Sequence, residues 1–541
     1  MNKSARIAAS FFVLFLILSP IQDARAVYSG PLNFEFRDVL FYQPSNLQIK
    51  IYDPNKTNLP AYQRYSYYTC PEWKQSDCSK VADLNATYRA TIVLPPCAEP
   101  TATYCIENLS FRKAEDEWNN ASLIRSINAP RHAPVEEINL PYSGSMSLWS
   151  ISTKNPKLNS KFAVFASFEI PESTLKSKTN KFTNLQIRIL PYQDAVFDSK
   201  NPPKIYAFDT GIDINGNARF GVEQFPEKTV WEDDLGRGII TDWDPDLQAQ
   251  VSLRIPNSIS GWMGGRLNQA EVDIQPYSPT MNRLTVSAGP VDVPRISIDV
   301  PQDQLTSTVK NVFPQFDWTN PPGGVIQNTD VAGDYSLKLL DAIRSFAKDK
   351  STGSEKVWIL KSFVPSSQRC LNDSSRLLGF VTTNAAVYST DPPQYAGGSL
   401  NYSVGSMHFD SHGSVFEGNY QLILRSDIAR CLYGFTNAPI EASVSISGEG
   451  FNTQIPTSSS MERNGWISLS AYKFHFSNPV LSVVFSQKIV AESSQSTSIT
   501  NSQKTPAGVN LLKSVKCSKG KIVKVFKNVG GICPSGYKKT V

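Results

Sequence analysis

Histidines are scarce in this 541-residue chain, which limits the metal sites and proton-transfer sites that it can build. There are four histidines, and only His408 and His412 lie close together, in the run His408-Phe-Asp-Ser-His412. On a helix, this spacing would place both rings on one face, where a third ligand could complete a zinc site. Glycine and serine residues on both sides of the run instead favour a strand end or turn. We therefore predict a solvated turn and no metal site here.

Acidic residues cluster in two neighbouring runs, which are candidates for calcium binding and for glycoside hydrolysis. Glu232-Asp-Asp234 precedes Asp242-Trp-Asp-Pro-Asp246, and Asp213-Ile-Asn-Gly-Asn217 has a similar composition. Alternate carboxylates can bind calcium, but the twelve-residue spacing of a calcium loop is missing. A hairpin turn at Asn215-Gly216 explains the third run. Paired carboxylates could also serve a glycosidase, but the sequence does not single out a pair.

The motifs of several enzyme families are missing from the sequence. It contains no Gly-x-Ser-x-Gly nucleophile elbow, no phosphate-binding loop, no dinucleotide fingerprint and no His-Glu-x-x-His. These absences count against those families and leave other enzymes open. The sequence therefore predicts no cofactor and identifies no catalytic residue.

The first 26 residues have the pattern of an export signal. Lys3 and Arg6 precede an apolar run over residues 7–18, and Ala24-Arg-Ala26 has the small-x-small form of a cleavage site. A run of about a dozen apolar residues is too short to cross a bilayer comfortably. We expect the mature chain to begin near Val27 and to be secreted or held on the outer face of the cell envelope, with no transmembrane segment after cleavage. An uncleaved anchor is the alternative.

The cysteines fall into pairs along the chain, and an exported chain with an even number of them favours disulfides over metal or thiolate chemistry. The successive pairs are Cys70 and Cys78, Cys97 and Cys105, Cys370 and Cys431, and Cys517 and Cys533. Eight cysteines allow about a hundred connectivities, so sequential pairing is a prediction from spacing. Crossed pairing remains open among the first four.

Charge is distributed unevenly, and the C-terminal end is basic. Of the formal net charge of +5, residues 1–26 contribute +2 and the nine lysines after Glu492 contribute +9, so residues 27–492 carry about −6. The lysines of the terminal segment are Lys513, Lys516, Lys519, Lys521, Lys524, Lys527, Lys538 and Lys539. Such a segment attracts anionic polymers or lipid headgroups. We predict that it binds one of these in the cell envelope and not nucleic acid; a soluble basic cap is the alternative.

Aromatic residues crowd the first cysteine pair. These are Tyr62, Tyr65, Tyr67, Tyr68 and Trp73. Exposed rings of this kind can stack on sugars or form protein interfaces. Ordinary packing within strands is the interpretation that we favour.

Alternation of polar and apolar residues dominates the chain and predicts half-buried strands. The clearest cases are 32–36, 47–51, 185–189, 247–255, 296–300 and 442–446. One segment, Tyr335 to Lys348, has helical spacing, with Asp334 as a possible N-cap. A second, weaker helix is predicted over Ala114 to Ile127, with a loop as the alternative. The fold class is therefore mainly β: tandem antiparallel β-sandwich-like domains, one or two short helices and a small C-terminal disulfide-closed β module.

Changes in composition suggest the domain boundaries. After the signal, we predict an N-terminal β region over 27–300, with a division into two subdomains as the alternative, and a proline-rich connection over 301–324. A second β domain over 325–490 and a polar, flexible linker over 491–508 follow. Residues 509–541 form a basic mini-module, with a strand over 521–527 and a turn at Gly530-Gly531.

Several motifs resemble those of uncharacterised secreted proteins of actinobacteria. They are Cys517-Ser-Lys-Gly-Lys521, Cys533-Pro-Ser-Gly-Tyr-Lys-Lys539, Ile428-Ala-Arg-Cys-Leu-Tyr-Gly-Phe435, Asn464-Gly-Trp466 and Ser260-Gly-Trp-Met-Gly-Gly-Arg266. The resemblance covers the mature chain in scattered pieces, and it implies lineage and export but no catalytic residue. Together with the charge pattern, it favours a non-catalytic surface-binding, adhesion or envelope-structure protein. The alternative is an extracellular hydrolase acting on glycan or another polymer.

Overall fold

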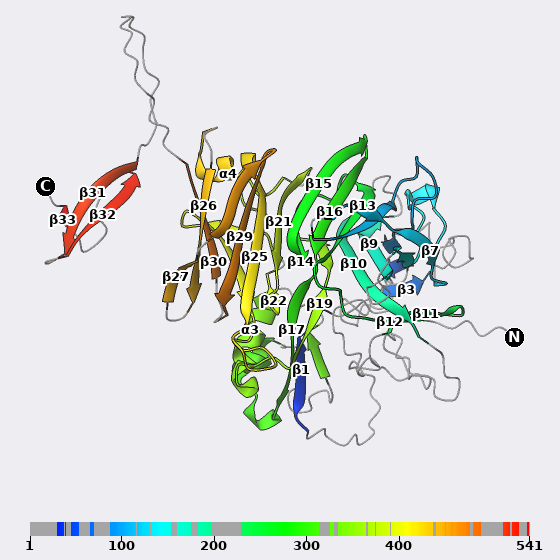
Figure 1. The fold of residues 1–541 in the computed structure, drawn as a ribbon, viewed down its shortest axis with the longest axis horizontal. Coiled ribbons are helices and arrows are strands. Elements are labelled where there is room, and N and C mark those ends of the chain that lie inside the picture. Colours follow the sequence, from blue (N-terminus) through cyan, green and yellow to red (C-terminus); the bar gives the residue numbers. More distant parts are fainter. Residues whose placement is uncertain are drawn as a thin grey trace, which may run out of the picture. The chain divides into compact units, whose positions relative to one another are not determined.

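A computed structural model gives the architecture of most of the chain (Figure 1). It describes residues 30–36, 38, 45–52, 65–69, 87–114, 116–129, 131–152, 160–174, 182–195, 229–312, 325–328, 334–363, 366–373, 375–389, 391–436, 440–448, 451–455, 457–476, 480–487, 512–519, 522–529 and 538–539. The chain divides into two compact units, Met1–Lys488 and Ile489–Val541. The predicted linker over 491–508 belongs to the second unit and lies outside the described residues. The predicted signal segment over 1–26 lies outside them too.

The long sheet, with fifteen strands among the residues described, runs through the first unit. Its main path has the order β28-β29-β25-β21-β14-β20-β10-β9-β4-β2-β3, and two short hairpins extend it beside β9 and β10. Its strands are β2 (Asn46–Tyr52), β3 (Tyr65–Thr69), β4 (Thr87–Val93), β7 (Ser122–Ser126), β8 (Ser147–Ser150), β9 (Lys161–Thr174), β10 (Thr183–Asp194), β11 (Thr229–Asp233), β12 (Gly236–Ile240), β14 (Gly261–Arg266), β20 (Ile359–Ser362), β21 (Leu377–Thr383), β25 (Glu417–Arg425), β28 (Thr457–Arg463) and β29 (Trp466–His475).

A five-stranded sheet, counted over the described ranges, packs on one end of the long sheet and forms the first sandwich. Its order is β15-β16-β13-β5-β6, with β5 (Cys105–Lys113), β6 (Asn119–Asn120), β13 (Leu247–Pro256), β15 (Asn268–Ser278) and β16 (Met281–Gly289). Alternation in β13 turns Val251 and Leu253 into the shared core. The rings of Phe111 on β5 and Phe162 on β9 stack across the two sheets at 3.9 Å. The alternation predicted over 247–255 thus gives a strand with one buried face.

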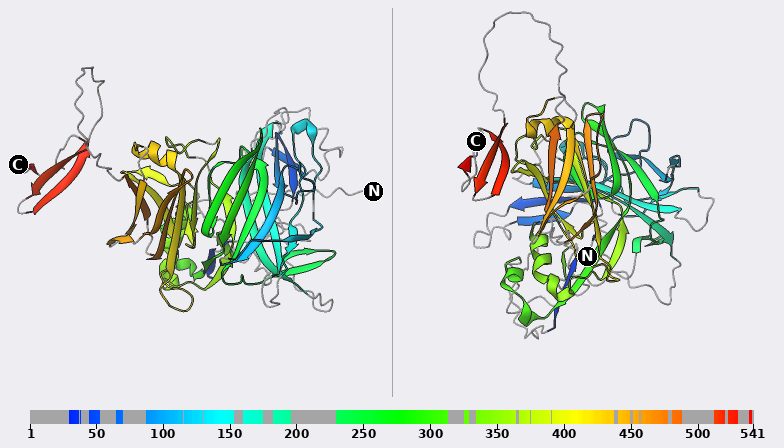
Figure 2. Two further views of the ribbon diagram at one scale, coloured as in Figure 1. Left: turned by 45° about the horizontal axis from the view of Figure 1, so that its top comes forward. Right: turned by 60° about the vertical axis from the view of Figure 1, so that its left-hand side comes forward.

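The second sandwich lies at the other end of the long sheet (Figure 2). Its outer sheet, six-stranded in the part of the chain described, has the order β22-β24-β30-β26-β27 with β23 beside β24. The strands are β22 (Val387–Tyr388), β23 (Gln394–Ala396), β24 (Ser399–Gly405), β26 (Ile440–Gly448), β27 (Phe451–Ile455) and β30 (Val480–Gln487). Leu422 and Leu424 of β25 share a core with Leu481 and Val483 of β30. The expectation of antiparallel sandwiches is confirmed.

Strand β14 belongs to both sandwiches, because the two cores lie on opposite faces of the long sheet. Trp262 faces the core of the second sandwich and Met263 that of the first, and both are fully buried. β14 pairs in parallel with β21 and antiparallel with β20. A strand buried on both faces carries no alternation of polar and apolar residues, which explains why the sequence pattern did not reveal β14 or β21.

We expect Gly265→Ala to lower the free energy of unfolding by about 1–3 kcal/mol, because overpacking at this position displaces the backbone. A Cβ atom at Gly265 would lie 2.0 Å from the carbonyl oxygen of Ile359 on β20. At Gly289 the nearest atoms are 3.8 Å away, so Gly289→Ala is the matched control. Urea unfolding of both variants tests this prediction; equal midpoints would contradict it.

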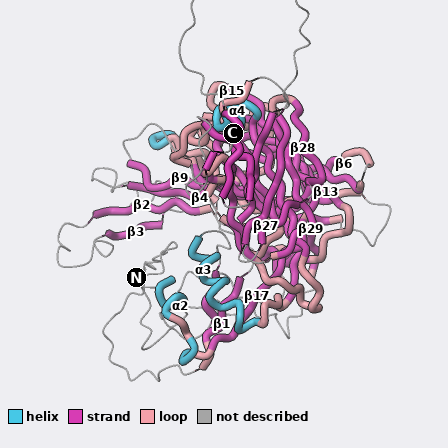
Figure 3. Tube along the Cα trace, turned by 90° about the vertical axis from the view of Figure 1, so that its left-hand side faces the viewer, coloured by secondary structure: helices cyan, strands magenta, loops and turns pink. Residues whose placement is uncertain are grey.

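A four-stranded sheet, over the residues that the structure covers, and a helical layer complete the first unit (Figure 3). The sheet has the order β18-β1-β17-β19, with β1 (Leu32–Phe36), β17 (Val291–Val300), β18 (Val325–Asn328) and β19 (Gly353–Val357). The helices of this layer are α2 (Ser307–Val312) and α3 (Asp334–Ile343), with 3-10 turns at Gln302–Gln304 and Arg344–Ala347. A further 3-10 turn, Glu136–Ile138, contributes Ile138 to the core of the first sandwich. The predicted helix is confirmed: Leu339, Leu340 and Ile343 lie buried against the core, and its last turn tightens into a 3-10 turn.

The weaker helix predicted over Ala114 to Ile127 is wrong. This segment forms β6, which pairs with β5, and β7, which pairs with β8. Pairing with other strands, rather than the local spacing of apolar residues, decides the secondary structure of this segment. The sequence also missed α4 (Ser426–Tyr433), which ends at Gly434 in a left-handed conformation with φ of 66°.

Strand pairing crosses the segment 301–324. β1 pairs with β17 on one side of it and, in parallel, with β18 on the other. β10 and β14 likewise pair with β20, and β14 pairs with β21. Residues from the predicted regions 27–300 and 325–490 therefore share the same sheets.

Two of the predicted disulfides are present, Cys97–Cys105 and Cys370–Cys431, with Cα–Cα distances of 5.0 and 6.0 Å. Cys70, Cys78 and Cys533 lie outside the described residues, and Cys517 lies in β31.

Among the helices described, none has the length and apolar character needed to cross a membrane.

The second unit contains a small antiparallel sheet, three-stranded over its described residues, in the order β32-β31-β33. Its strands are β31 (Leu512–Lys519), β32 (Ile522–Val529) and β33 (Lys538–Lys539). The strand predicted over 521–527 is confirmed within β32. The turn predicted at Gly530-Gly531 lies outside the described residues.

Candidate functional site

The predicted basic site lies on the small sheet of the second unit. β31 is its central strand, and it places Ser518 opposite Lys538 and Cys517 opposite Lys539. Lys516, Lys538 and Lys539 are exposed. The other strand lysines occupy register positions on the same two long strands: Lys513 opposite Asn528, Lys519 opposite Ile522, Lys524 opposite Cys517 and Lys527 opposite Ser514. Lys521 lies outside the described residues.

This arrangement concentrates positive charge within a few strand spacings. Neighbouring strands are about 4.8 Å apart, which is well inside the Debye length of about 8 Å at physiological ionic strength. No Asp or Glu follows Glu492 in the sequence, so this segment contains lysines without acidic side chains. The sheet is therefore suited to binding a polyanion rather than to acid–base chemistry.

A shallow groove of about 290 Å³ lies beside the two short hairpins of the long sheet. Its lining residues are Ile124, Arg125, Leu148, Lys161, Tyr192, Asp194, Ala195, Trp231, Leu235, Gly236 and Arg237. Two ion pairs occupy it: Lys161 with Asp194, and Arg125 with Asp233, at 2.5 Å between Nη1 and Oδ2. The sequence had grouped Asp233 only with its acidic neighbours, and its partner Arg125 is 108 residues away.

The arrangement around Trp231 indicates a structural role for this groove. The Arg125 guanidinium lies 4.9 Å above the Trp231 ring, and Tyr192 meets that ring edge-on at 5.7 Å. A Cβ atom at Gly238 would lie 2.1 Å from the Trp231 Nε1 atom, so the ring presses against the β12 backbone. The indole is only 7% exposed and offers little surface for a ligand to stack on.

The Asp233 carboxylate is stabilised in its charged form. Burial acts to raise its pKa, but hydrogen bonds from Arg125 and from the backbone N–H groups of Asn128 and Leu235 outweigh this and lower the pKa below its usual range. Burial raises the pKa of the Tyr192 phenol. Both groups thus keep their ordinary protonation state at neutral pH, and the groove locks the hairpin β7–β8 to the hairpin β11–β12.

The His408 to His412 run forms a turn, as predicted. The Asp410 Oδ1 atom accepts hydrogen bonds from the backbone N–H groups of His412 and Ser414, at 2.8 and 2.9 Å. His408 Nδ1 lies 3.1 Å from the Phe476 carbonyl oxygen. Within the part of the chain that the structure describes, no group of three metal-ligating side chains is found.

The other candidates are dispersed or outside the described residues. In the second acidic run, Trp243 is buried and Asp246 adopts a left-handed conformation with φ of 63°. Residues 213–217 lie outside the described residues, as do Tyr62 and Trp73. Tyr65, Tyr67 and Tyr68 lie in β3.

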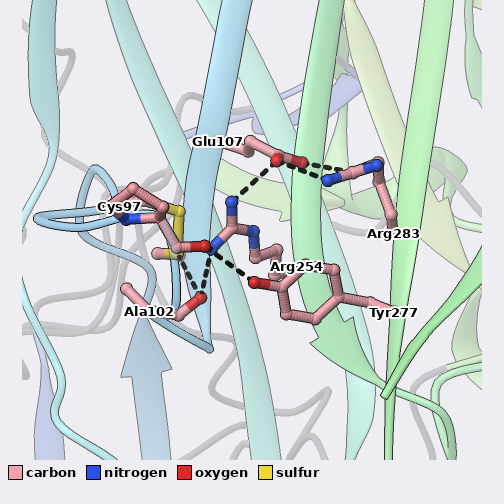
Figure 4. Close-up of a disulfide and its surroundings, with 8 residues drawn as sticks. Cys97, Ala102, Glu107, Arg254, Tyr277 and Arg283 are labelled. Carbon is pink, nitrogen blue, oxygen red and sulfur yellow. Dashed lines mark hydrogen bonds and ion pairs between the residues drawn. A yellow bond between two sulfur atoms is a disulfide. The ribbon is translucent and has the colours of Figure 1, made fainter.

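The structure assembles one polar cluster that the sequence did not reveal (Figure 4). Glu107 on β5 accepts hydrogen bonds from Arg254 on β13, at 2.7 Å, and from Arg283 on β16, at 2.5 and 2.7 Å. Burial acts to raise the pKa of Glu107, but these two arginines outweigh it and lower the pKa. No local motif marks the cluster, because Glu107 is 147 residues from Arg254 and 176 residues from Arg283 in the sequence.

Arg254 also holds the loop that the Cys97–Cys105 disulfide closes. Its Nη1 atom donates to the carbonyl oxygens of Pro100 and Ala102, at 2.6 and 2.7 Å. The Tyr277 hydroxyl donates to the same Pro100 oxygen at 2.8 Å, and the Arg254 guanidinium lies 4.5 Å from the Tyr277 ring. The cluster therefore fixes this loop at one end of the five-stranded sheet.

Comparisons of this chain with protein-family models, with curated proteins and with solved structures find no match.

Proposed function

We propose that this is a secreted or envelope-associated, non-catalytic binding protein whose basic C-terminal sheet attaches it to an anionic surface. The observation that carries the proposal is the small sheet of the second unit. It exposes Lys516, Lys538 and Lys539, and its segment contains no acidic residue. Each lysine close to an anionic membrane surface contributes about 1 kcal/mol of binding free energy.

The first unit supports a role outside the cytosol. Its two disulfides are typical of oxidising compartments. The export pattern of residues 1–26 agrees with this location, and β-sandwiches commonly carry binding sites on sheet faces and loops. The first unit would then present the binding face, while the second unit holds the protein at the surface.

Replacing Lys516, Lys538 and Lys539 together by glutamine is expected to weaken binding to vesicles of phosphatidylglycerol and phosphatidylcholine by roughly a hundredfold. The loss corresponds to about 1 kcal/mol for each lysine. The measurement is co-sedimentation with vesicles over a range of lipid concentrations. A soluble polyphosphate in the same assay distinguishes a lipid headgroup from an anionic polymer as the preferred source of phosphate.

Two controls separate charge from structure. The triple arginine variant at the same positions keeps the charge and should keep the affinity. Glutamine at Lys113, Lys338 and Lys350, three exposed lysines of the first unit, removes the same charge elsewhere and should change little. Wild-type affinity of the triple glutamine variant for both probes, or binding unaffected by raising the salt to 1 M, would contradict the proposal.

A further inference from the structure

We propose that the outer face of the five-stranded sheet is a binding site for a neutral polysaccharide. This inference depends on the proposed binding role of the first unit but not on the basic tail. It begins from strand register. Core residues such as Val251 on β13 and Val286 on β16 point into the first sandwich. Side chains alternate along a strand, so the residues next to them in each strand point outward.

The outward positions form rows of neutral polar side chains across the sheet. One row runs from Ser287 through Gln250 and Ser110 to Asn120, each directly paired with the next. The Ser110 hydroxyl donates to the Asn120 side-chain carbonyl at 2.9 Å. Of these four residues, Gln250 and Asn120 are accessible on the face, whereas Ser287 and Ser110 are only 7% and 1% exposed.

The next row repeats this chemistry. Thr285, Ser252 and Asn108 are directly paired across β16, β13 and β5. The hydroxyls of Ser252 and Thr285 lie 3.0 Å apart, and the Asn108 amide donates to Ser110 at 2.8 Å, which ties the two rows together. All three residues are partly exposed. The middle of the face is therefore made of amides and hydroxyls, without a charged or large apolar side chain.

An aromatic ring lies near each end of these rows. At one end, the Arg112 guanidinium lies 4.5 Å from the ring of the partly exposed Trp118. At the other end, Arg254 holds the partly exposed Tyr277 ring beside the Glu107 cluster. Rings at such positions can stack on the apolar faces of sugars.

The charges of the face balance. Arg112, Arg254 and Arg283 are matched by Glu107, Glu271 and Asp273, the last two of which lie opposite Ser287 and Thr285 at the edge strand β15. A nucleic acid or an anionic lipid surface requires an excess of positive charge, and this face has none. The tail and this face are thus suited to chemically different partners.

The chemistry of the central rows selects among neutral partners. Protein interfaces are anchored by buried aromatic or apolar side chains, whereas the centre of this face has only amides and hydroxyls. Both groups donate and accept hydrogen bonds, which matches the hydroxyl groups of a sugar chain. The longer row spans four strands about 4.8 Å apart, or about 14 Å, which suits an oligosaccharide better than a single sugar.

The test is titration calorimetry of the purified full chain against three neutral hexasaccharides: mannohexaose, maltohexaose and the hexamer of N-acetylglucosamine. The buffer contains 0.5 M NaCl, which screens the lysines of the tail. We expect saturable binding to at least one of them. The lysine-to-glutamine triple variant should bind that sugar equally well, so a failure of the proposed attachment through the tail would not affect this result.

Two variants locate the site. Gln250→Ala removes the central amide, and the loss of one or two hydrogen bonds should weaken binding about tenfold. Asn108→Ala should have a similar effect. Gln394→Ala, which removes an exposed glutamine from β23 in the other sandwich, is the matched control and should bind as the wild type does. Absence of binding to all three sugars, or wild-type affinity in both Gln250→Ala and Asn108→Ala, would overturn the proposal.

Discussion

Arg266→Ala is expected to lower the free energy of unfolding by about 3–5 kcal/mol, because it leaves the buried Asp38 carboxylate without its partner. The Arg266 side chain is completely buried, and its Nε atom donates to Asp38 Oδ2 at 2.8 Å. Its Nη2 atom donates to the Ala386 carbonyl oxygen at 2.9 Å, and Nη1 donates to that of Ala385. One guanidinium thus binds the Oδ2 atom of the Asp38 carboxylate and backbone carbonyl groups of the chain segment that follows β21.

The position of this ion pair explains why its loss should affect the whole first unit. Asp38 follows β1 of the four-stranded sheet, whereas Arg266 is the last residue of β14 in the long sheet. The guanidinium also lies 4.5 Å from the ring of Tyr388, which is buried in the core of the second sandwich. The pair therefore connects the two sheets at the point where the core is shared.

Guanidinium chloride unfolding of three variants tests this prediction. Arg266→Lys keeps the charge but lacks the forked donors, so it should be destabilised by nearly as much as Arg266→Ala. Arg283→Ala, at a side chain that is 42% exposed, removes a surface arginine and should cost less than about 1 kcal/mol. A loss below 1 kcal/mol for Arg266→Ala would show that the buried pair is not needed for stability.

Removing the Cys370–Cys431 disulfide is expected to lower the stability of the oxidised protein by about 4 kcal/mol. The two cysteines are 61 residues apart, and a crosslink that closes a loop of this size restricts the unfolded chain strongly. In the folded state, the disulfide ties the segment before β21 to α4, whose Ile428 and Ala429 pack into the core of the second sandwich. The double serine variant, measured by urea unfolding, gives the effect.

The Cys97–Cys105 disulfide provides the matched comparison. Its cysteines are only eight residues apart, so the same model gives about 2.5 kcal/mol. Arg254 and Tyr277 also hold this loop through Pro100 and Ala102, so the folded loop keeps other contacts after reduction. Equal losses in the two double serine variants would contradict a stabilisation set by loop length.

Local sequence patterns determined most of the elements that have one buried face. Alternation located β1, β2, β10, β13, β17 and β26. In β1, β13 and β17, one face lies in a core and the residues between are mostly at least partly exposed, which produces this pattern. In β10, Arg188 on the other face is buried as well. The helical spacing of apolar residues also predicted the helix that begins at Asp334. The positions of the lysines and the cysteines could also be interpreted from the sequence, since charge and thiol content are properties of composition rather than of folding.

Strands buried on both faces could not be found in this way. β14 and β21 carry apolar residues and glycines without alternation, since each of their faces meets a different core. The parallel pairing of β1 with β18 also has no local signal. Pairing of this kind depends on contacts between segments that are far apart in the sequence, and a period of two residues does not identify the neighbouring strand.

The outer face of the five-stranded sheet and the ion pairs of Glu107 and Asp38 show which contacts the sequence could not predict. The pattern in β13 already predicted that Gln250 and Ser252 point outward, but not that Ser110 and Thr285 lie beside them. The partners of Glu107 and Asp38 were equally hidden, because strand order decides which charges meet. The sequence by itself thus located the alternating strands, the export pattern, the basic tail and the two cysteine pairs that the structure contains. Only the tertiary structure decided which side chains share one face or one ion pair, because distant strands become neighbours only when their apolar faces are buried together.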